Sequence, residues 1–293
     1  MNTSSIRRLV ARSIPYQARR IIPLRIAQHL YFEGIFCARL NGREIVKLYH
    51  AGFQIENEIF WRGFEGCHEK QSMQVFANII QQLKPKTLWD IGANSGTYGL
   101  LGLALHPDLK VIFFEPIPKA AALIRKNLKL NSFEATVFEI AVGDYDGQGE
   151  IYFEKGLDFA YGVTVNKNTI ESGHDSECMT IRVHRLDSLI VSENLDVPDL
   201  VKLDVETYEY EVLKGLGNRF PKDCIFLIEI LSEDLGFKLM EFFSQSTHQF
   251  WNINDETGTI REVDILGKSD FYNFLIAPIT MSLTLRVLLG STK

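Results

Sequence analysis

The segment from Trp89 to Gly99 constrains the fold more than any other part of the chain. An apolar run ends at Asp90 and enters a turn with three glycines, and a short helical pattern follows. A second apolar run, 110–114, then ends at Glu115. The pattern predicts a strand–turn–helix–strand unit with carboxylates at the carboxyl ends of both strands. In an open α/β sheet, that edge is where ligands bind.

Apolar runs and amphipathic stretches alternate along most of the chain. Alternating strands and helices imply a mainly parallel sheet with both faces covered. The last two strands lack a full helical pattern between them, which is consistent with an antiparallel edge. The predicted helices are 69–83, 97–105, 118–130, 207–215 and 233–244, and the predicted strands are 87–91, 110–114, 135–141, 179–184, 200–204, 224–230, 249–253 and 271–277.

The first 60 residues are predicted to form a helical extension to a main domain at 61–293. Residues 24–40 are interpreted as a helix, 45–49 as a short strand and 52–66 as loop-rich. The first 32 residues contain six arginines and no acid. This bias leaves two readings open, a basic helix in weak contact with a membrane surface or helices packed on the main domain, and we favour the second.

Composition excludes several classes of protein. A net charge of -6 argues against nucleic acid as the main partner. The four cysteines, at positions 37, 67, 178 and 224, show neither zinc-site nor disulfide spacing, which favours a reducing, cytoplasmic location. The seven histidines form no metal-binding pattern with acids on a helix, so we predict metal independence. No apolar run approaches the ~20 residues of a membrane span.

The first turn has three possible ligand-binding interpretations, and the alternative is a βα turn that only packs and binds no ligand. A dinucleotide fingerprint requires G-x-G-x-x-G, whereas the glycines here stand at 92, 96 and 99. A phosphate loop requires Gly-Lys-Ser/Thr, and no lysine lies between Trp89 and Leu109. Small residues that admit a ligand to the backbone, with carboxylates for its amine and hydroxyls, indicate S-adenosylmethionine. Glu115 would accept the ribose hydrogen bonds, although a nicotinamide site would use an acid similarly.

Two later strand ends add to this pattern. Ala141 and Val142 are small and apolar and would wall an adenine, or they are simply a strand end. Lys202 lies inside an apolar strand, where burial is costly unless the charge is paired. Asp204 and Glu206 follow it, either beside the transferable methyl group and the acceptor hydroxyl or as acids favoured at a helix N-terminus.

Four motifs together resemble the FkbM-type S-adenosylmethionine-dependent methyltransferases: residues 90–99, Glu115-Pro116, 185–189 and 201–206. The resemblance covers roughly Trp61 to Glu229. It implies the class I methyltransferase fold, a Rossmann-like seven-stranded sheet whose last strand is antiparallel. It also implies O-methylation, commonly of sugar hydroxyls in glycans or of natural products. One departure is Thr207, where the family usually has glycine.

The pattern and the resemblance together predict the site. The general base is sought among the four residues given below as catalytic and Glu69, Asp204 being favoured. The acceptor is expected to be a hydroxylated small molecule or glycan. A nicotinamide-dependent oxidoreductase and a non-catalytic adenosylmethionine-binding protein are the alternatives. The predicted catalytic residues are Asp204, Glu206, Glu229 and His68, and the predicted cofactor-binding residues are Glu69, Asp90, Gly92, Ala93, Asn94, Gly96, Tyr98, Glu115, Pro116, Ala141, Val142 and Asp204.

Overall fold

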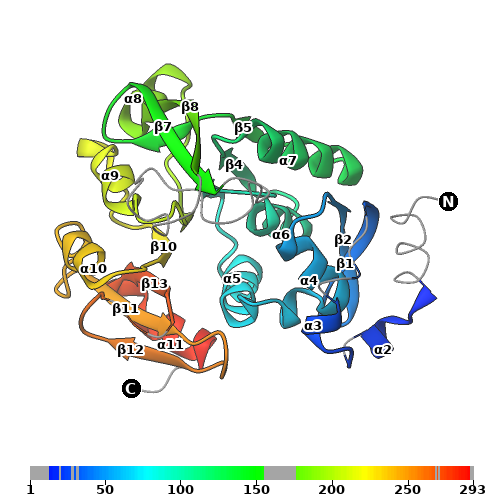
Figure 1. Ribbon diagram of the computed structural model, residues 1–293. Helices are drawn as coiled ribbons and strands as arrows, with labels where there is room; N and C mark the ends of the chain where they lie inside the picture. Colours follow the sequence, from blue (N-terminus) through cyan, green and yellow to red (C-terminus); the bar gives the residue numbers. More distant parts are fainter. Residues whose placement is uncertain are drawn as a thin grey trace.

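The computed structural model describes residues 13–19, 21–27, 30, 33–154, 176–267, 269 and 271–290. Its centre is an eight-stranded sheet in the order β12-β11-β13-β10-β9-β3-β4-β5 (Figure 1). The strands are β3 (Thr87–Ile91), β4 (Lys110–Phe114), β5 (Thr136–Phe138), β9 (Leu200–Leu203), β10 (Ile225–Glu229), β11 (His248–Ile253), β12 (Ile260–Val263) and β13 (Asn273–Pro278).

The sheet is mainly parallel, as predicted. Strands β5, β4, β3, β9 and β10 pair in parallel, and the last strand, β13, runs antiparallel to both of its neighbours. The expected seven strands are therefore present. The eighth, β12, pairs antiparallel with β11 at the edge and is not in the predicted set. It is only four residues long, and one of them is buried, so it carries little periodic signal.

Strand residues alternate between two cores, which is why both faces are covered by helices. Leu88 and Phe113 pack into one core with α5 (Lys70–Leu83), α6 (Thr97–Leu105), α7 (Pro118–Asn131) and α11 (Ser282–Leu289). Trp89 and Phe114, one position along, pack into the other with α8 (Leu186–Ser192), α9 (Glu209–Lys214) and α10 (Glu233–Leu239). This period of two is the rule for strands buried on both faces.

The N-terminal segment corrects the prediction of a helical extension. Of the described residues in 24–40, only Leu24–Ala27 form a helix, α3, and Gly34–Leu40 form strand β1. Residues 34–40 alternate between buried and exposed positions, a strand period rather than a helical one. The short strand predicted at 45–49 is confirmed within β2 (Arg43–His50), which pairs antiparallel with β1.

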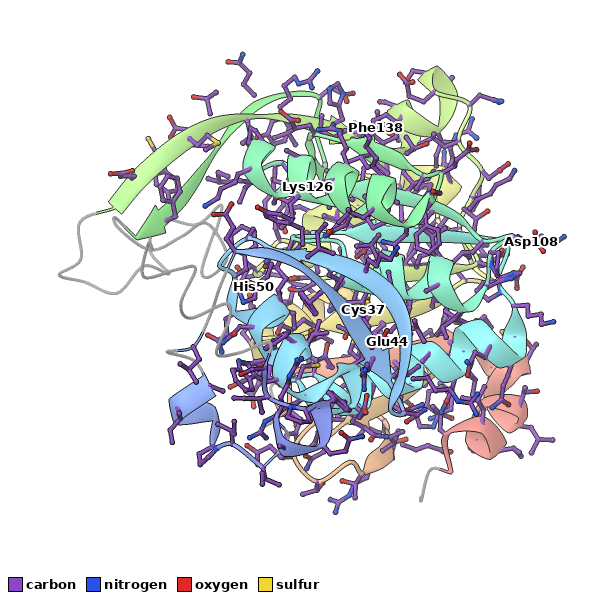
Figure 2. The ribbon with its side chains drawn as sticks, turned by 90° about the vertical axis from the view of Figure 1, so that its right-hand side faces the viewer. Cys37, Glu44, His50, Asp108, Lys126 and Phe138 are labelled. Atoms are coloured by element: carbon purple, nitrogen blue, oxygen red, sulfur yellow. The ribbon has the colours of Figure 1, made fainter. Side chains whose placement is uncertain are left out.

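The β1–β2 hairpin is fastened to α7. Side-chain amide oxygens of Asn127 and Asn131 accept hydrogen bonds of 2.7 and 2.8 Å from the backbone N–H groups of Tyr49 and Lys47. Figure 2 shows the hairpin, with Cys37 and Glu44 on it, curving across the face below the helix that carries Lys126. The hairpin edge is thus covered, as exposed strand edges generally are in folded proteins.

Residues 52–66 are also more ordered than predicted. They contain α4 (Gln54–Arg62) and a short 3-10 helix, η1 (Phe64–Gly66), where a loop was expected. Three aromatic side chains of this segment, Phe60, Trp61 and Phe64, are buried in the core shared with α5. The proposed division at residue 60 falls inside α4 and stays a prediction. Short helix α2 (Tyr16–Arg19) precedes α3. The membrane contact left open for the arginine-rich first 32 residues falls in part on residues 1–12, which lie outside the described residues.

A second sheet flanks the end of the main one. Its order is β6-β8-β7, from β6 (Ala141–Gly143), β7 (Gly147–Glu154) and β8 (Ser176–Arg185). The single strand predicted at 135–141 is therefore divided between β5 and β6, which belong to different sheets. Two more 3-10 helices are η3 (Gly217–Arg219) and η4 (Ile279–Met281). No helix in the described ranges has both the length and the apolar character needed to span a bilayer.

Candidate functional site

A cavity of about 330 Å³ opens where β4, β3, β9 and β10 end, in the size range of small-molecule sites. Every residue assigned to the site from the sequence lines it, apart from Gly96. The structure does not bring Gly96 to the wall: a Cβ there would lie 3.1 Å from the Ile124 side chain. Lining residues that the sequence did not single out for the site include Ile55, Ser95, Thr97, Ile117, Ala120, Ile140, Ile151 and Tyr208.

Asp90 joins the end of β3 to the first turn of α6. Its side chain is 2 % exposed, and Oδ2 accepts a hydrogen bond of 2.9 Å from the Gly99 backbone N–H. Burial raises the pKa of Asp90 to about 7, against the lowering effects of the Gly99 hydrogen bond and of Lys202. Asp90 therefore holds the turn and also presents a carboxyl group to the cavity.

Glu115, at the end of β4, connects two turns. Oε2 accepts a hydrogen bond of 2.7 Å from the Asn94 N–H, and Oε1 accepts one of 2.9 Å from the Ile117 N–H. Burial raises its pKa to about 7 despite these two bonds. Each carboxylate oxygen has more than one lone pair, so both can still accept a hydrogen bond from a ligand.

The turns that follow β3 and β9 are in backbone contact. Gly92 has a φ of +75°, and a Cβ on it would lie 1.8 Å from the Asp204 carbonyl oxygen, so only glycine fits there. The Asp204 N–H also donates to the Ile91 carbonyl over 3.1 Å. The first turn of the sequence motif and the 201–206 motif therefore form one wall of the cavity.

Lys202 is buried and paired. It is 2 % exposed, and Nζ lies 3.1 Å from Asp204 Oδ2 and 3.9 Å from Glu69 Oε1. Its ammonium also lies 5.1 Å from the centre of the Tyr98 ring. Burial lowers the pKa of Lys202, but the charges of Asp204 and Glu69 outweigh burial and raise it above the ordinary value. These contacts offset the free-energy cost of burying a charged lysine inside an apolar strand.

Carboxyl groups outnumber cations in the described lining. Burial, with the charge of Asp204, raises the pKa of Glu206 to about 7 and raises that of Glu229 further. A positively charged ligand would favour the ionised forms, because opposite charge lowers a carboxyl pKa. The carboxyl-bearing lining residues are Glu69, Asp90, Glu115, Asp204, Glu206 and Glu229, and the basic ones are Lys202 and His68.

Tyr98 contributes a polar atom to the same cavity. Its ring packs edge-on against Phe76 at 5.1 Å, and its hydroxyl oxygen is buried with no hydrogen-bond partner among the described residues. A buried hydroxyl without a partner is costly, so a ligand that accepts its hydrogen bond would be stabilised here.

The comparison with protein families decides the assignment of the chain. The model of the methyltransferase FkbM domain matches residues 90–262, more than half of the sequence. The chain belongs to the FkbM methyltransferase domain family. The match begins at Asp90 and includes the later strand ends of the cavity, and three of the four motifs that suggested the family, all but 185–189, line it.

Three relatives support the membership of this FkbM domain. Hexuronic acid methyltransferase AglP of Haloferax volcanii is 28% identical over 183 residues, which are 62% of this chain and 71% of the relative. The 2-O-methyltransferase NoeI of Sinorhizobium fredii is 28% identical over 181 residues, 56% of this chain and 72% of the relative. The 31-O-demethyl-FK506 methyltransferase FkbM of Streptomyces tacrolimicus is 26% identical over 159 residues, 46% and 61% respectively. The protein is therefore a methyltransferase.

Thr207 stands where the FkbM family usually has glycine, and its backbone is in the left-handed region. Glu206 has a φ of +55° and Thr207 a φ of +78°, so the chain leaves β9 through two left-handed residues. This conformation costs little for glycine and is strained for a β-branched residue. Thr207 therefore adopts the path that glycine would favour.

The 185–189 motif of the FkbM domain stands outside the cavity and braces it. Arg185 donates two hydrogen bonds, of 2.9 and 2.6 Å, to the Asp187 carboxylate and one of 2.7 Å to the Asp144 carbonyl. Asp144 directly follows β6, whose Ala141 and Val142 line the cavity. The motif supports, from outside the cavity, the strand that carries Ala141 and Val142.

Proposed function

We propose that this FkbM domain transfers a methyl group from S-adenosylmethionine to a hydroxyl oxygen of a sugar or a small natural product. The observation that carries the proposal is the composition of the cavity wall. Six carboxyl side chains and one lysine line the part of this wall that the structure describes. A sulfonium and an ammonium group on one ligand complement such a wall.

The lining residues suit the parts of that molecule. Glu115 is placed to accept hydrogen bonds from two neighbouring hydroxyls, as a ribose offers. Ile117, Ala141 and Val142 form an apolar wall suited to an adenine ring. The Tyr98 hydroxyl is available to donate to a carboxylate. When bound, S-adenosylmethionine supplies an electrophilic methyl group, and the protein supplies position and a path for the acceptor proton.

The acceptor class is supported by the relatives. AglP is named for a hexuronic acid, and NoeI for methylation at a 2-hydroxyl. The first name gives a sugar acid as acceptor and the second an oxygen atom, and we extend both features to this chain. We also expect turnover without a metal and a cytoplasmic location.

The experiment is a transfer assay with S-adenosylmethionine labelled in its methyl group, run over panels of glycans, nucleotide sugars and hydroxylated natural products. We expect label in an ether-linked product, at a rate unchanged by excess chelator. Label in an amine or thiol product would contradict the oxygen specificity, and binding without transfer to any panel member would favour the non-catalytic alternative. Loss of the rate with chelator would contradict metal independence.

A further inference from the structure

His68 and Glu58 form a pair at the edge of the cavity, in which Glu58 is buried and the His68 side chain is 51% exposed. His68 Nδ1 lies 3.0 Å from Glu58 Oε2, which also accepts a hydrogen bond of 2.8 Å from the His68 backbone N–H. Glu58 is 7 % exposed, and its other oxygen accepts a hydrogen bond of 2.7 Å from the Gln54 side chain. Because the carboxylate can only accept, Nδ1 carries the hydrogen, and Nε2 of a neutral imidazole presents a lone pair.

This pair stands at the end of the cavity away from Glu115. The sheet order β4-β3-β9-β10 places Glu115 over the first of these strands and Lys202 and Glu229 over the last two. His68 lines the cavity and its Nε2 lies 3.9 Å from Glu69 Oε2, and Glu69 in turn lies 3.9 Å from Lys202. With the ribose at Glu115, His68 faces the half that remains for the acceptor.

The carboxyl groups nearby are poorer bases. Burial and the charge of Asp204 raise the pKa of Glu229, so it holds a proton near neutral pH. Asp204 already accepts a hydrogen bond of 3.1 Å from Lys202. Glu206, whose pKa is raised to about 7, is the remaining competitor, and among the described residues no hydrogen-bond partner holds its side chain as Glu58 holds His68.

We propose that His68 is the general base of the transfer and that Glu58 is a positioning residue that fixes its tautomer. This inference rests on the proposed function. The acceptor hydroxyl gives its proton to Nε2 as its oxygen forms a bond to the methyl carbon. The carbon–sulfur bond of the donor breaks and its electron pair stays on sulfur, which becomes neutral. The imidazolium that results is stabilised by Glu58, the logic of a histidine–carboxylate pair.

The charges around His68 set the expected pH dependence. Glu58 faces it from α4, Glu69 from the start of α5, and Asp255 from the turn between β11 and β12. Burial lowers the pKa of His68, but these three acids outweigh burial and raise it above the ordinary value. Since the base works in its neutral form, the rate should rise with pH through a pKa above the ~6.5 of free histidine.

The first test needs no acceptor. Nitrogen NMR of histidine-labelled protein should show neutral His68 with its hydrogen on Nδ1, and its titration should give a pKa above ~6.5. Glu58→Gln should lower that pKa by about one unit, because it removes the neighbouring charge. A hydrogen on Nε2, or a pKa unchanged in Glu58→Gln, would overturn the dyad whatever the acceptor is.

The second test uses the methyl glycosides of neutral hexoses and hexuronic acids as probe acceptors with labelled S-adenosylmethionine. His68→Gln should lower kcat by about 10²–10⁴-fold while S-adenosylmethionine affinity stays within about threefold. In Glu58→Gln the acid limb of kcat/KM should shift to lower pH with the NMR pKa. His184→Gln is the matched control, because His184 lies 3.4 Å from Asp146 but outside the cavity.

The outcomes separate the two proposals. No transfer by the unaltered protein to these probes or to any member of the acceptor panels contradicts the proposed function, independently of the NMR result. Transfer that survives in His68→Gln at more than about a tenth of the rate contradicts the dyad.

Discussion

Single residues in this site serve the fold and the ligand together. Asp90 and Glu115 each accept hydrogen bonds from backbone N–H groups of the turns they face, so removing either carboxyl would loosen the turn as well as the ligand contact. A test of ligand binding therefore requires a variant that keeps the turn. Asp90→Asn meets this condition, since an amide oxygen can replace Oδ2 as the acceptor from Gly99.

Thr207 offers a prediction at the same scale. With a φ of +78°, Thr207 adopts a backbone conformation that is unstrained for glycine and strained for threonine. Thr207→Gly should raise the free energy of unfolding by about 1 kcal/mol, the relief of strain exceeding the added entropy of the unfolded chain. Thermal unfolding should show Tm higher by about 2–4 °C. Thr207→Ala keeps the Cβ and is the matched control, and equal Tm values for the two variants would contradict the account.

Sequence patterns predicted the residues of the site better than their partners. The carboxylates after β3, β4 and β9 were predicted because strand ends in a parallel sheet meet at one edge. Glu58 and Asp255 reach the site from α4 and from a distant turn, and nothing in the local pattern marks them. Contacts between residues far apart in the chain leave no periodic signal, so the partners of Lys202 and His68 required the structure.

At the scale of elements, α5 is capped by a residue from another part of the chain. Asp255 Oδ1 accepts hydrogen bonds of 2.8 Å from the backbone N–H groups of both Gln71 and Ser72, and Oδ2 accepts one of 2.7 Å from the Ser72 hydroxyl. Glu69, the residue directly before the first residue of α5, makes no side-chain capping hydrogen bond. The acidic turn between β11 and β12 therefore satisfies the first N–H groups of the helix beside the cavity.

Asp255→Ala should lower the free energy of unfolding by about 1–3 kcal/mol, because two backbone donors and a hydroxyl lose their acceptor. Thermal unfolding should report a fall in Tm of roughly 3–10 °C. Glu256→Ala is the control, since Glu256 lies in the same turn with its side chain exposed. A Tm for Asp255→Ala equal to that of the control would show that the cap contributes nothing.

Helices and strands were predicted accurately where the sequence marks their ends and their periodicity clearly. Helix 97–105 and strand 110–114 have the predicted bounds, because glycines, prolines and buried runs mark their ends. Strand β1 was predicted as part of a helix because short alternating runs fit either period, whereas β2 was predicted as a strand. Edge strand β12, with one buried residue, had no pattern to find.

For the whole molecule, buried acids predict how stability depends on pH. Burial raises the pKa of Asp90, Glu115 and Glu206 to about 7, and that of Glu56 and Glu209 to about 8. In the unfolded chain these groups ionise near ~4, so from pH 7 to 8.5 the folded protein holds more protons than the unfolded chain. Stability is therefore lost as pH rises through this window.

The measurement is thermal unfolding of the ligand-free protein across that window. We expect the free energy of unfolding to fall by at least about 1 kcal/mol and Tm by roughly 2–4 °C. Glu209→Gln should reduce the slope, because its side chain is fully buried and its Oε1 accepts a hydrogen bond of 3.0 Å from Val205 that glutamine can keep. A Tm that stays level or rises with pH would contradict the assignment of raised pKa values.

The ligand that binds at the end of β3 decides the chemistry of the site, and calorimetry tests the identity of that ligand directly. We expect S-adenosylmethionine to bind the unaltered protein and NAD to produce no heat of binding. Asp90→Asn should weaken S-adenosylmethionine by about 10–100-fold, the loss of a hydrogen bond to a charged group, with Tm little changed. Binding of NAD without S-adenosylmethionine, or undiminished affinity in Asp90→Asn, would contradict the central claim.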